Sequence, residues 1–116
     1  MTAGGLLLLA LLATSCGGGT TEAVCALPAP HDLKVVSIKG SAVDIVWGAG
    51  AGAPASYILE AGSAPGTSDQ SRTDLHSSAT TYTATGVKPG TYYARVFGVS
   101  ACGTSPASNE VVAVVP

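Results

Sequence analysis

The sequence feature that most constrains this chain is a two-residue alternation of side-chain type. It begins near residue 31 and recurs in short runs, most clearly at 43–47 and 57–61. Successive side chains of a β-strand point to opposite faces, so this period predicts strands with one buried face. The 3.6-residue period of an amphipathic helix is not evident in this region. The pattern therefore predicts an all-β domain.

Turn-forming residues divide this region into seven expected strands. The chain has 15 Gly and 7 Pro, and many of them separate the alternating runs. The first expected strand begins near Leu33, and the others span 43–47, 57–61, 70–75, 80–85, 91–99 and 111–115, with a turn at 103–108 before the last. Seven short strands separated by turns are typical of a sandwich of two sheets.

The inward faces of the expected strands form a candidate core. Trp47, Tyr57 and Tyr92 are its main aromatic members. The other residues expected to face inward are Leu33, Val43, Ile45, Leu59, Tyr82 and Val96. The run 111–115 is apolar at every position, so the alternation does not decide which of its faces is buried.

Residues 31–116 resemble a fibronectin type III domain. The run 43–47 matches the family's second strand with its buried Trp, and 87–92 (Val-Lys-Pro-Gly-Thr-Tyr) resembles its Leu-x-Pro-x-Thr-x-Tyr segment. Residues 103–110 resemble its Gly-x-Ser-x-x-Ser turn. The resemblance implies an immunoglobulin-like seven-stranded β-sandwich. Either Tyr92 or Tyr93 could be the family's corner Tyr, and Tyr92 is favoured because it shares a face with the apolar Val96.

The N-terminal residues have the pattern of an export signal. The apolar run 6–13 is too short for a membrane-spanning helix, which needs about 20 apolar residues, but it fits a secretory signal. Ala-Thr-Ser-Cys at 13–16 resembles the lipobox of bacterial lipoproteins. That resemblance implies a signal peptide over 1–15 and a lipid on Cys16. An ordinary cleaved signal and an uncleaved anchor are the alternatives.

Residues 16–30 are expected to form the lipidated Cys and a flexible tether, because Gly dominates the start of this stretch. If Cys16 carries lipid, Cys25 and Cys102 remain as a pair, and disulfides persist in exported proteins. In the family that 31–116 resembles, the start of the first strand and the loop before the last strand lie at the same end. The resemblance therefore implies a Cys25–Cys102 disulfide, and two free thiols are the alternative.

Residues for catalysis, metal binding or nucleic-acid binding are not apparent. His31 adjoins Asp32 and His76 follows Asp74 by two positions, and both His are interpreted as solvated loop residues. Cys and His lack the short spacing of zinc ligands, and the Gly-x-Ser-x-Gly nucleophile motif does not occur. The net charge of -2 lacks the basic field that nucleic-acid binding needs. We therefore expect no catalytic residues, no metal, no cofactor and no nucleic-acid partner.

One surface group is a candidate binding face. Tyr93, Arg95 and Phe97 alternate with the inward residues of the strand 91–99, so they should lie on its outer face. Ile58 and Glu60 should stand beside them on the neighbouring strand. Aromatic residues and Arg are enriched at binding hot spots, so this face could bind a sugar ring or a partner protein. The alternative is a set of cross-strand pairs that only stabilise the sheet.

The sequence thus predicts an exported, non-catalytic interaction or spacer module of a bacterial cell envelope, held to a membrane by its N-terminal lipid. The expected partner is another protein or a polysaccharide of that envelope. The alternatives are a carbohydrate-binding adaptor that uses the aromatic face, or a small hydrolase. A sandwich domain can host many functions, so the fold alone does not choose between them.

Overall fold

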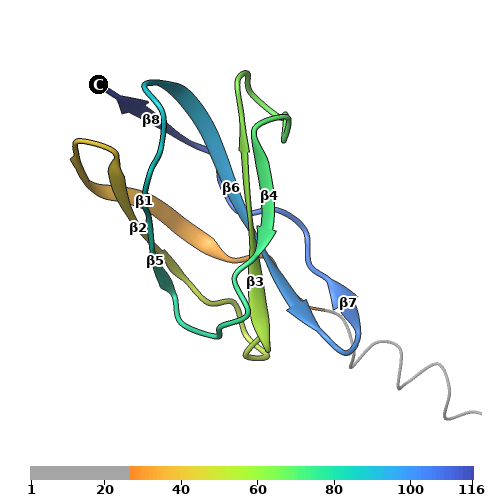
Figure 1. Cartoon of the computed structure of the whole chain (residues 1–116). Coiled ribbons are helices and arrows are strands. Elements are labelled where there is room, and N and C mark those ends of the chain that lie inside the picture. Colours follow the sequence, from red (N-terminus) through yellow and green to blue (C-terminus); the bar gives the residue numbers. More distant parts are fainter. Residues whose placement is uncertain (1–26) are drawn as a thin grey trace, which may run out of the picture.

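The computed structural model describes residues 27–116. The predictions for the signal peptide, Cys16, most of the tether and Cys25 lie outside these residues. The described part forms two antiparallel sheets packed face to face and contains no helix (Figure 1). Within it, nothing helical has the length and apolarity to cross a membrane. The prediction of an all-β sandwich is confirmed.

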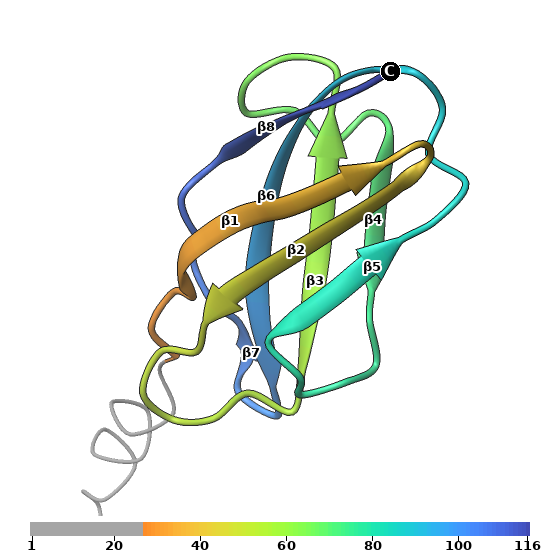
Figure 2. The same ribbon diagram turned by 90° about the vertical axis from the view of Figure 1, so that its left-hand side faces the viewer.

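The first sheet has three strands in the order β1–β2–β5 (Figure 2). The second sheet has the order β4–β3–β6–β7, and β8 also pairs with β6. The strands of the first sheet are β1 (His31–Lys39), β2 (Ala42–Gly48) and β5 (Thr81–Ala84). Those of the second are β3 (Ser56–Gly62), β4 (Ser71–Asp74), β6 (Gly90–Ser100), β7 (Gly103–Thr104) and β8 (Val111–Val115).

The structure places an additional two-residue strand, β7, inside the expected turn before β8, and β7 and β8 both lie along β6. Two buried serines bridge the gap between them. Ser105 Oγ accepts a hydrogen bond from the Gly98 N–H at 2.8 Å, and Ser108 Oγ accepts one from the Val96 N–H at 2.9 Å. The expected turn at 103–108 is therefore partly wrong: the chain reverses at 101–102, and residues 103–104 already pair with β6.

The core lies between the sheets and is centred on Tyr57 and Val96, which are 1% and 0% exposed. Trp47 packs edge-on against Tyr57, with ring centroids 5.2 Å apart and planes at 70°. The buried core residues are Leu33, Val43, Ile45, Trp47, Tyr57, Val96, Ala113 and Val115, with Leu59 and Tyr92 partly buried against them. The largest of these side chains, Trp47 and Tyr57, come from the inward faces of alternating runs.

Pairing with β6 decides the orientation of β8. Ala113 lies opposite Tyr92, so Ala113 and Val115 share the inward face of that strand. Val112 and Val114 point outward and are 52% and 62% exposed. The neighbouring strand therefore supplies the orientation that an all-apolar run could not.

Tyr82 corrects the predicted core. It lies opposite Ile45 in the register of β2 and β5, so its side chain is on the inward side of the sheet. However, β5 is the edge strand of the three-stranded sheet, and Tyr82 remains 36% exposed. The prediction that Tyr82 is a core residue is wrong because alternation gives the direction of a side chain and not the distance of its strand from the edge.

Candidate functional site

The candidate binding face lies on the outer side of the five-stranded sheet. The register of β3 and β6 sets Gly62 opposite Tyr93, Glu60 opposite Arg95 and Ile58 opposite Phe97. On the other side of β3, Arg72 of β4 lies opposite Glu60. Three adjacent strands thus place one acidic and two basic side chains in a single row across the sheet.

Glu60 is the centre of this row. It is only 6% exposed, and its carboxylate accepts hydrogen bonds from Arg95 Nη2 at 2.5 Å and from Arg72 Nη1. Both guanidinium groups also lie over Phe97, with Cζ 5.2 Å from the ring centroid for Arg72 and 5.7 Å for Arg95. One carboxylate and one aromatic ring therefore hold both arginines by ion pairing and by cation–π attraction.

This arrangement changes how the predicted face is interpreted. Tyr93, Arg95 and Phe97 are half-buried, and the Arg95 side chain is 25% exposed. The Phe97 ring already has two cations of the same chain over it, and the Arg95 guanidinium already has a carboxylate. The structure brings the three residues to one face as predicted, but their contacts fit cross-strand stabilisation of the sheet better than an open hot spot.

The loop between β3 and β4 covers part of the same face. A Cβ atom on Gly62 would lie 2.0 Å from Thr67 Oγ1 and 2.2 Å from the Thr67 carbonyl oxygen, so the loop lies directly against the backbone of β3. The Gly66 carbonyl accepts a hydrogen bond from Arg95 Nη2 at 3.4 Å, and the Gly66 N–H donates to Glu110 Oε2 at 2.8 Å. Only Gly allows this close approach at position 62.

Asp69 organises the inside of that loop. Its carboxylate accepts hydrogen bonds from the Ser63 hydroxyl at 2.7 Å and from the Ser63 N–H at 2.9 Å, and Thr67 Oγ1 lies 3.0 Å away. These donors, led by the Ser63 hydroxyl, favour the ionised carboxylate and lower the pKa of Asp69 to about 2. The local sequence did not reveal this role, because Asp in a Gly/Ser/Pro-rich loop is common.

Two polar side chains fix the backbone at opposite ends of the sandwich. The Tyr92 hydroxyl donates to the Lys88 carbonyl at 2.7 Å, which is the contact of a tyrosine corner and distinguishes Tyr92 from Tyr93. At the other end, the Asn109 amide pairs with the backbone of Leu33: the Leu33 N–H donates to Oδ1 at 2.9 Å, and Nδ2 donates to the Leu33 carbonyl at 3.0 Å. This clamp was not predicted from the sequence.

The two histidines lie apart at loop and strand ends. The nitrogens of His31 lie 2.9 Å from Asp32 Oδ2 and 3.2 Å from the Ala49 carbonyl. His76 Nδ1 lies 3.7 Å from Asp74 Oδ1, and its side chain is 85% exposed. The hydrogen bonds found over residues 27–116 join neither imidazole to a hydroxyl or thiol nucleophile. In that same span, no group of three or more His, Cys, Asp or Glu is arranged to hold a metal ion.

Cys102 is exposed at the turn between β6 and β7, where its N–H donates to Ser100 Oγ at 3.1 Å. The segment that leads into β1 lies at the same end, since Pro28 and the Ala29 carbonyl lie against Gly50 in the β2–β3 loop. Cys25 falls outside the described residues, so its pairing with Cys102 stays a prediction.

Known proteins share the fold described above. The family model of the fibronectin type III domain matches residues 28–114. Among solved structures, an Fn3-like protein from Clostridium thermocellum is 26% identical with a TM-score of 0.62, over 78% of this chain and 96% of that one. The twitchin kinase region from C. elegans is 22% identical with a TM-score of 0.65, over 78% of this chain but only 17% of that one. No curated protein matches the sequence. Because the family model covers most of its length, the chain belongs to the fibronectin type III domain family.

Proposed function

We propose that this protein is a non-catalytic interaction or spacer module that is exported and held to a membrane of a bacterial cell envelope by a lipid on Cys16. Fibronectin type III domains generally serve as non-catalytic interaction or spacer modules. The family match over residues 28–114 is the observation that carries the proposal. The apolar run 6–13 and the small residues before Cys16 support the export and anchoring part.

The arrangement of the strands suits a displayed module. β1 starts at one end of the sandwich and Pro116 lies at the other, as Figures 1 and 2 show. A domain held from the N-terminal side of β1 would present its opposite end, with the β1–β2, β3–β4 and β5–β6 loops, away from the attachment. A disulfide between Cys25 and Cys102 would clamp the attached segment to the domain, and it is part of this proposal.

We expect the partner to be another protein or a polysaccharide of the envelope, since domains of this family commonly bind other proteins. The carbohydrate-binding alternative is less favoured, because Arg72 and Arg95 lie over the Phe97 ring that a sugar would stack on. The hydrolase alternative is also less favoured, because catalysis of that kind requires an oriented nucleophile–base pair. Neither His31 nor His76 belongs to such a pair within residues 27–116.

Anchoring is tested by fractionation of cells that express the full chain. We expect the wild-type protein in the membrane fraction, with an intact mass that includes acyl chains and a mature N-terminus at Cys16. Cys16→Ala should abolish the acylated form. Cys102→Ala is the matched control, since it removes a different cysteine and should remain acylated. A mature form that starts elsewhere and carries no lipid would refute anchoring at Cys16.

The non-catalytic role is tested separately. Cross-linking in the native envelope should capture a defined partner with the wild-type chain, and a panel of ester, peptide and glycoside substrates should show no turnover. Turnover that is lost in both His31→Ala and His76→Ala variants, with folding retained, would overturn the non-enzymatic assignment. If neither binding nor turnover is detected, the domain would serve as a spacer. Replacing it with another sandwich of similar length should then leave the function of the protein unchanged.

A further inference from the structure

A cleft with a volume of about 500 Å³ lies between the two sheets. It opens where β4 and β5, the edge strands of their sheets, lie on the same side of the sandwich (Figure 2). Its volume is in the range of about 300–1,000 Å³ that is usual for small-molecule sites. This cleft is separate from the outer face that carries Arg95 and Phe97, because it is on the inward side of the same sheet.

Small side chains create the space. Four alanines line the cleft, and two of them, Ala61 and Ala94, lie directly opposite each other in the register of β3 and β6. The other two are Ala84 on β5 and Ala113 on β8. Six further lining residues are aliphatic, and Tyr92 adds one aromatic ring: the six are Val35, Val43, Ile45, Leu59, Leu75 and Val87. The interior is therefore apolar but incompletely filled, in contrast to the close packing that is usual in cores.

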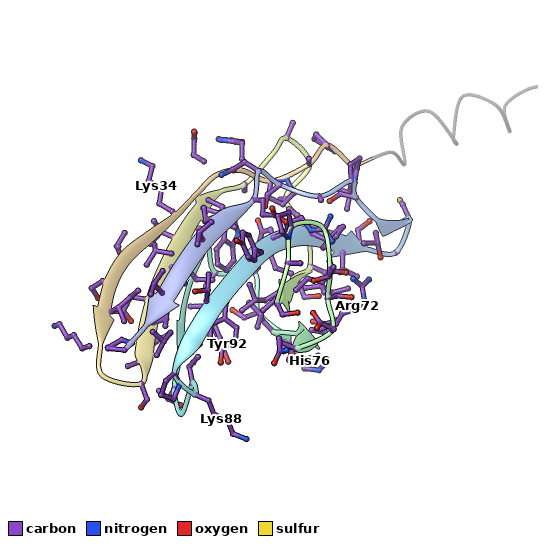
Figure 3. The ribbon with its side chains drawn as sticks, turned by 90° about the horizontal axis from the view of Figure 1, so that it is seen from above. Lys34, Arg72, His76, Lys88 and Tyr92 are labelled. Atoms are coloured by element: carbon purple, nitrogen blue, oxygen red, sulfur yellow. The ribbon has the colours of Figure 1, made fainter. Side chains whose placement is uncertain are left out.

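The mouth of the cleft is polar and has a single charge. Ser71 and Thr73 of β4 line one side, and Tyr82 of β5 lines the other. Lys88 is the one charged residue among the lining residues, and none of them is acidic. Among residues 27–116, the ion pairs of the structure do not include Lys88. The Tyr92 hydroxyl donates a hydrogen bond to the Lys88 carbonyl, and the two residues lie near each other in Figure 3.

We propose that this cleft binds a single-chain aliphatic amphiphile with an anionic end group, of the chemical class of the long-chain carboxylates. The aliphatic chain would lie between the sheets, which in such sandwiches are about 10 Å apart. The anionic group would stay at the mouth beside Lys88, because burying it in the aliphatic floor without a partner is highly unfavourable. The positive charge without a nearby acid selects an anion over a cation.

A linear aliphatic chain fits these observations better than a peptide. A peptide strand could pair with the backbone edge of β4 or β5, but its own amide groups would lack partners over a floor of Val, Ile, Leu and Ala. A hydrocarbon chain needs no such partners. The proposal does not depend on the interaction or spacer role, and a carboxylate could bind whether or not a macromolecular partner exists.

The test is a calorimetric titration of the full chain with dodecanoate, decanoate and dodecanol, each below its micelle concentration. Each methylene removed from the chain should weaken binding about fourfold, which is the conversion of about 0.8 kcal/mol per buried CH₂. Methyl NMR signals from the cleft residues Ala84 and Leu75 should shift on addition of dodecanoate. Absence of dodecanoate binding, or binding that is independent of chain length, would overturn the proposal.

Filling the cleft should remove the site. Ala94→Leu should lower dodecanoate affinity at least tenfold. Ala42→Leu is the matched control, because Ala42 is on β2 next to a lining residue but does not line the cleft. If Ala94→Leu does not fold, Ala84→Leu fills the same cleft from an edge strand. The segment before residue 27 is the same in every variant, so any binding there cancels in the comparison. Undiminished binding in a folded cleft variant would contradict the proposal.

The charge at the mouth is tested independently. Lys88→Gln should weaken dodecanoate binding about two- to fivefold, the conversion of up to about 1 kcal/mol for an exposed ion pair, and should leave dodecanol binding unchanged. Lys34→Gln is the control, since Lys34 is an exposed lysine on a different side of the molecule (Figure 3). An equal loss for both ligands, or an equal loss in both lysine variants, would refute the role of Lys88.

Discussion

Replacing Trp47 with Ala should remove a large part of the stability of this domain. Trp47 is 5% exposed and packs edge-on against Tyr57, which is itself 1% exposed. A buried aromatic side chain removes about 150–250 Å² from water, which at about 25 cal/mol per Å² corresponds to about 4–6 kcal/mol as an upper bound. Measured truncations of large core residues give about 3–5 kcal/mol, and this is the loss that we expect.

A second substitution separates packing from polarity. The indole N–H of Trp47 is buried and has no acceptor among residues 27–116. A buried donor without a partner is unfavourable by about 1–3 kcal/mol. Trp47→Phe retains a ring against Tyr57 and removes that donor, so it should lose less than half as much stability as Trp47→Ala. If the two variants lose the same amount, the ring contact with Tyr57 contributes little.

Urea denaturation measures both variants. Trp47 is the only Trp in the chain, so unfolding is followed by circular dichroism rather than by Trp fluorescence. The slope of the free energy against urea should match that of the wild type, which shows that the unfolded state has not changed. Val112→Ala is the control, because Val112 is 52% exposed and should change the stability by no more than about 0.5 kcal/mol. A loss below about 1 kcal/mol in Trp47→Ala would refute the core assignment.

Three further predictions concern the loop between β3 and β4 and the cysteines. Gly62→Ala should destabilise the domain by about 1–3 kcal/mol in urea melts, because the new methyl group would overlap Thr67, including its carbonyl oxygen; an unchanged midpoint would show that the loop moves freely. Asp69 has a pKa lowered from 3.8 to about 2, so its stabilisation is present above pH 4 and is lost as the pH falls toward 2. Between pH 4 and pH 2 the melting temperature of Asp69→Asn should therefore fall less than that of the wild type. An equal fall in the two proteins would contradict this. A Cys25–Cys102 disulfide should add about 4 kcal/mol by the chain-entropy model, and thiol titration of the unfolded, unreduced protein should then detect neither thiol; two reactive thiols would exclude the disulfide.

Much of the architecture could be predicted because it depends on local periodicity. Val43, Ile45 and Trp47 alternate along β2 and all three are buried. Side-chain direction in a strand follows from the backbone, so a period of two assigns the faces before any neighbour is known. Burial depends in addition on where the strand lies in its sheet. For that reason Tyr82 was assigned the right face but the wrong exposure, and the orientation of β8 required its pairing with β6.

The candidate site could be predicted only in part, because its chemistry depends on register between distant segments. The sequence placed Tyr93, Arg95 and Phe97 on one face, but it did not show that Glu60 would be buried between two arginines. Arg72 joins this group through the pairing of β3 with β4, and the run that contains it has no strong alternation. The sequence also did not show that the β3–β4 loop would lie against Gly62, since a Gly in a turn-rich stretch has no distinctive signal.

Two adjacent rungs of the five-stranded sheet, each a pair of opposed residues on β3 and β6, indicate where a ligand should be sought. On the outer face, the rung of Glu60 and Arg95 has its charges paired and its neighbouring aromatic ring covered by cations. On the inner face, the next rung, Ala61 and Ala94, carries only methyl groups and borders the cleft. Binding at the outer face would have to break existing ion pairs, whereas an aliphatic ligand in the cleft would fill space that the chain leaves open and bury apolar surface. The pairing of β3 with β6 thus engages the charged side chains of the outer face with one another and places the alanines at the cleft, so the inner side of the sheet is the better place to look for a ligand.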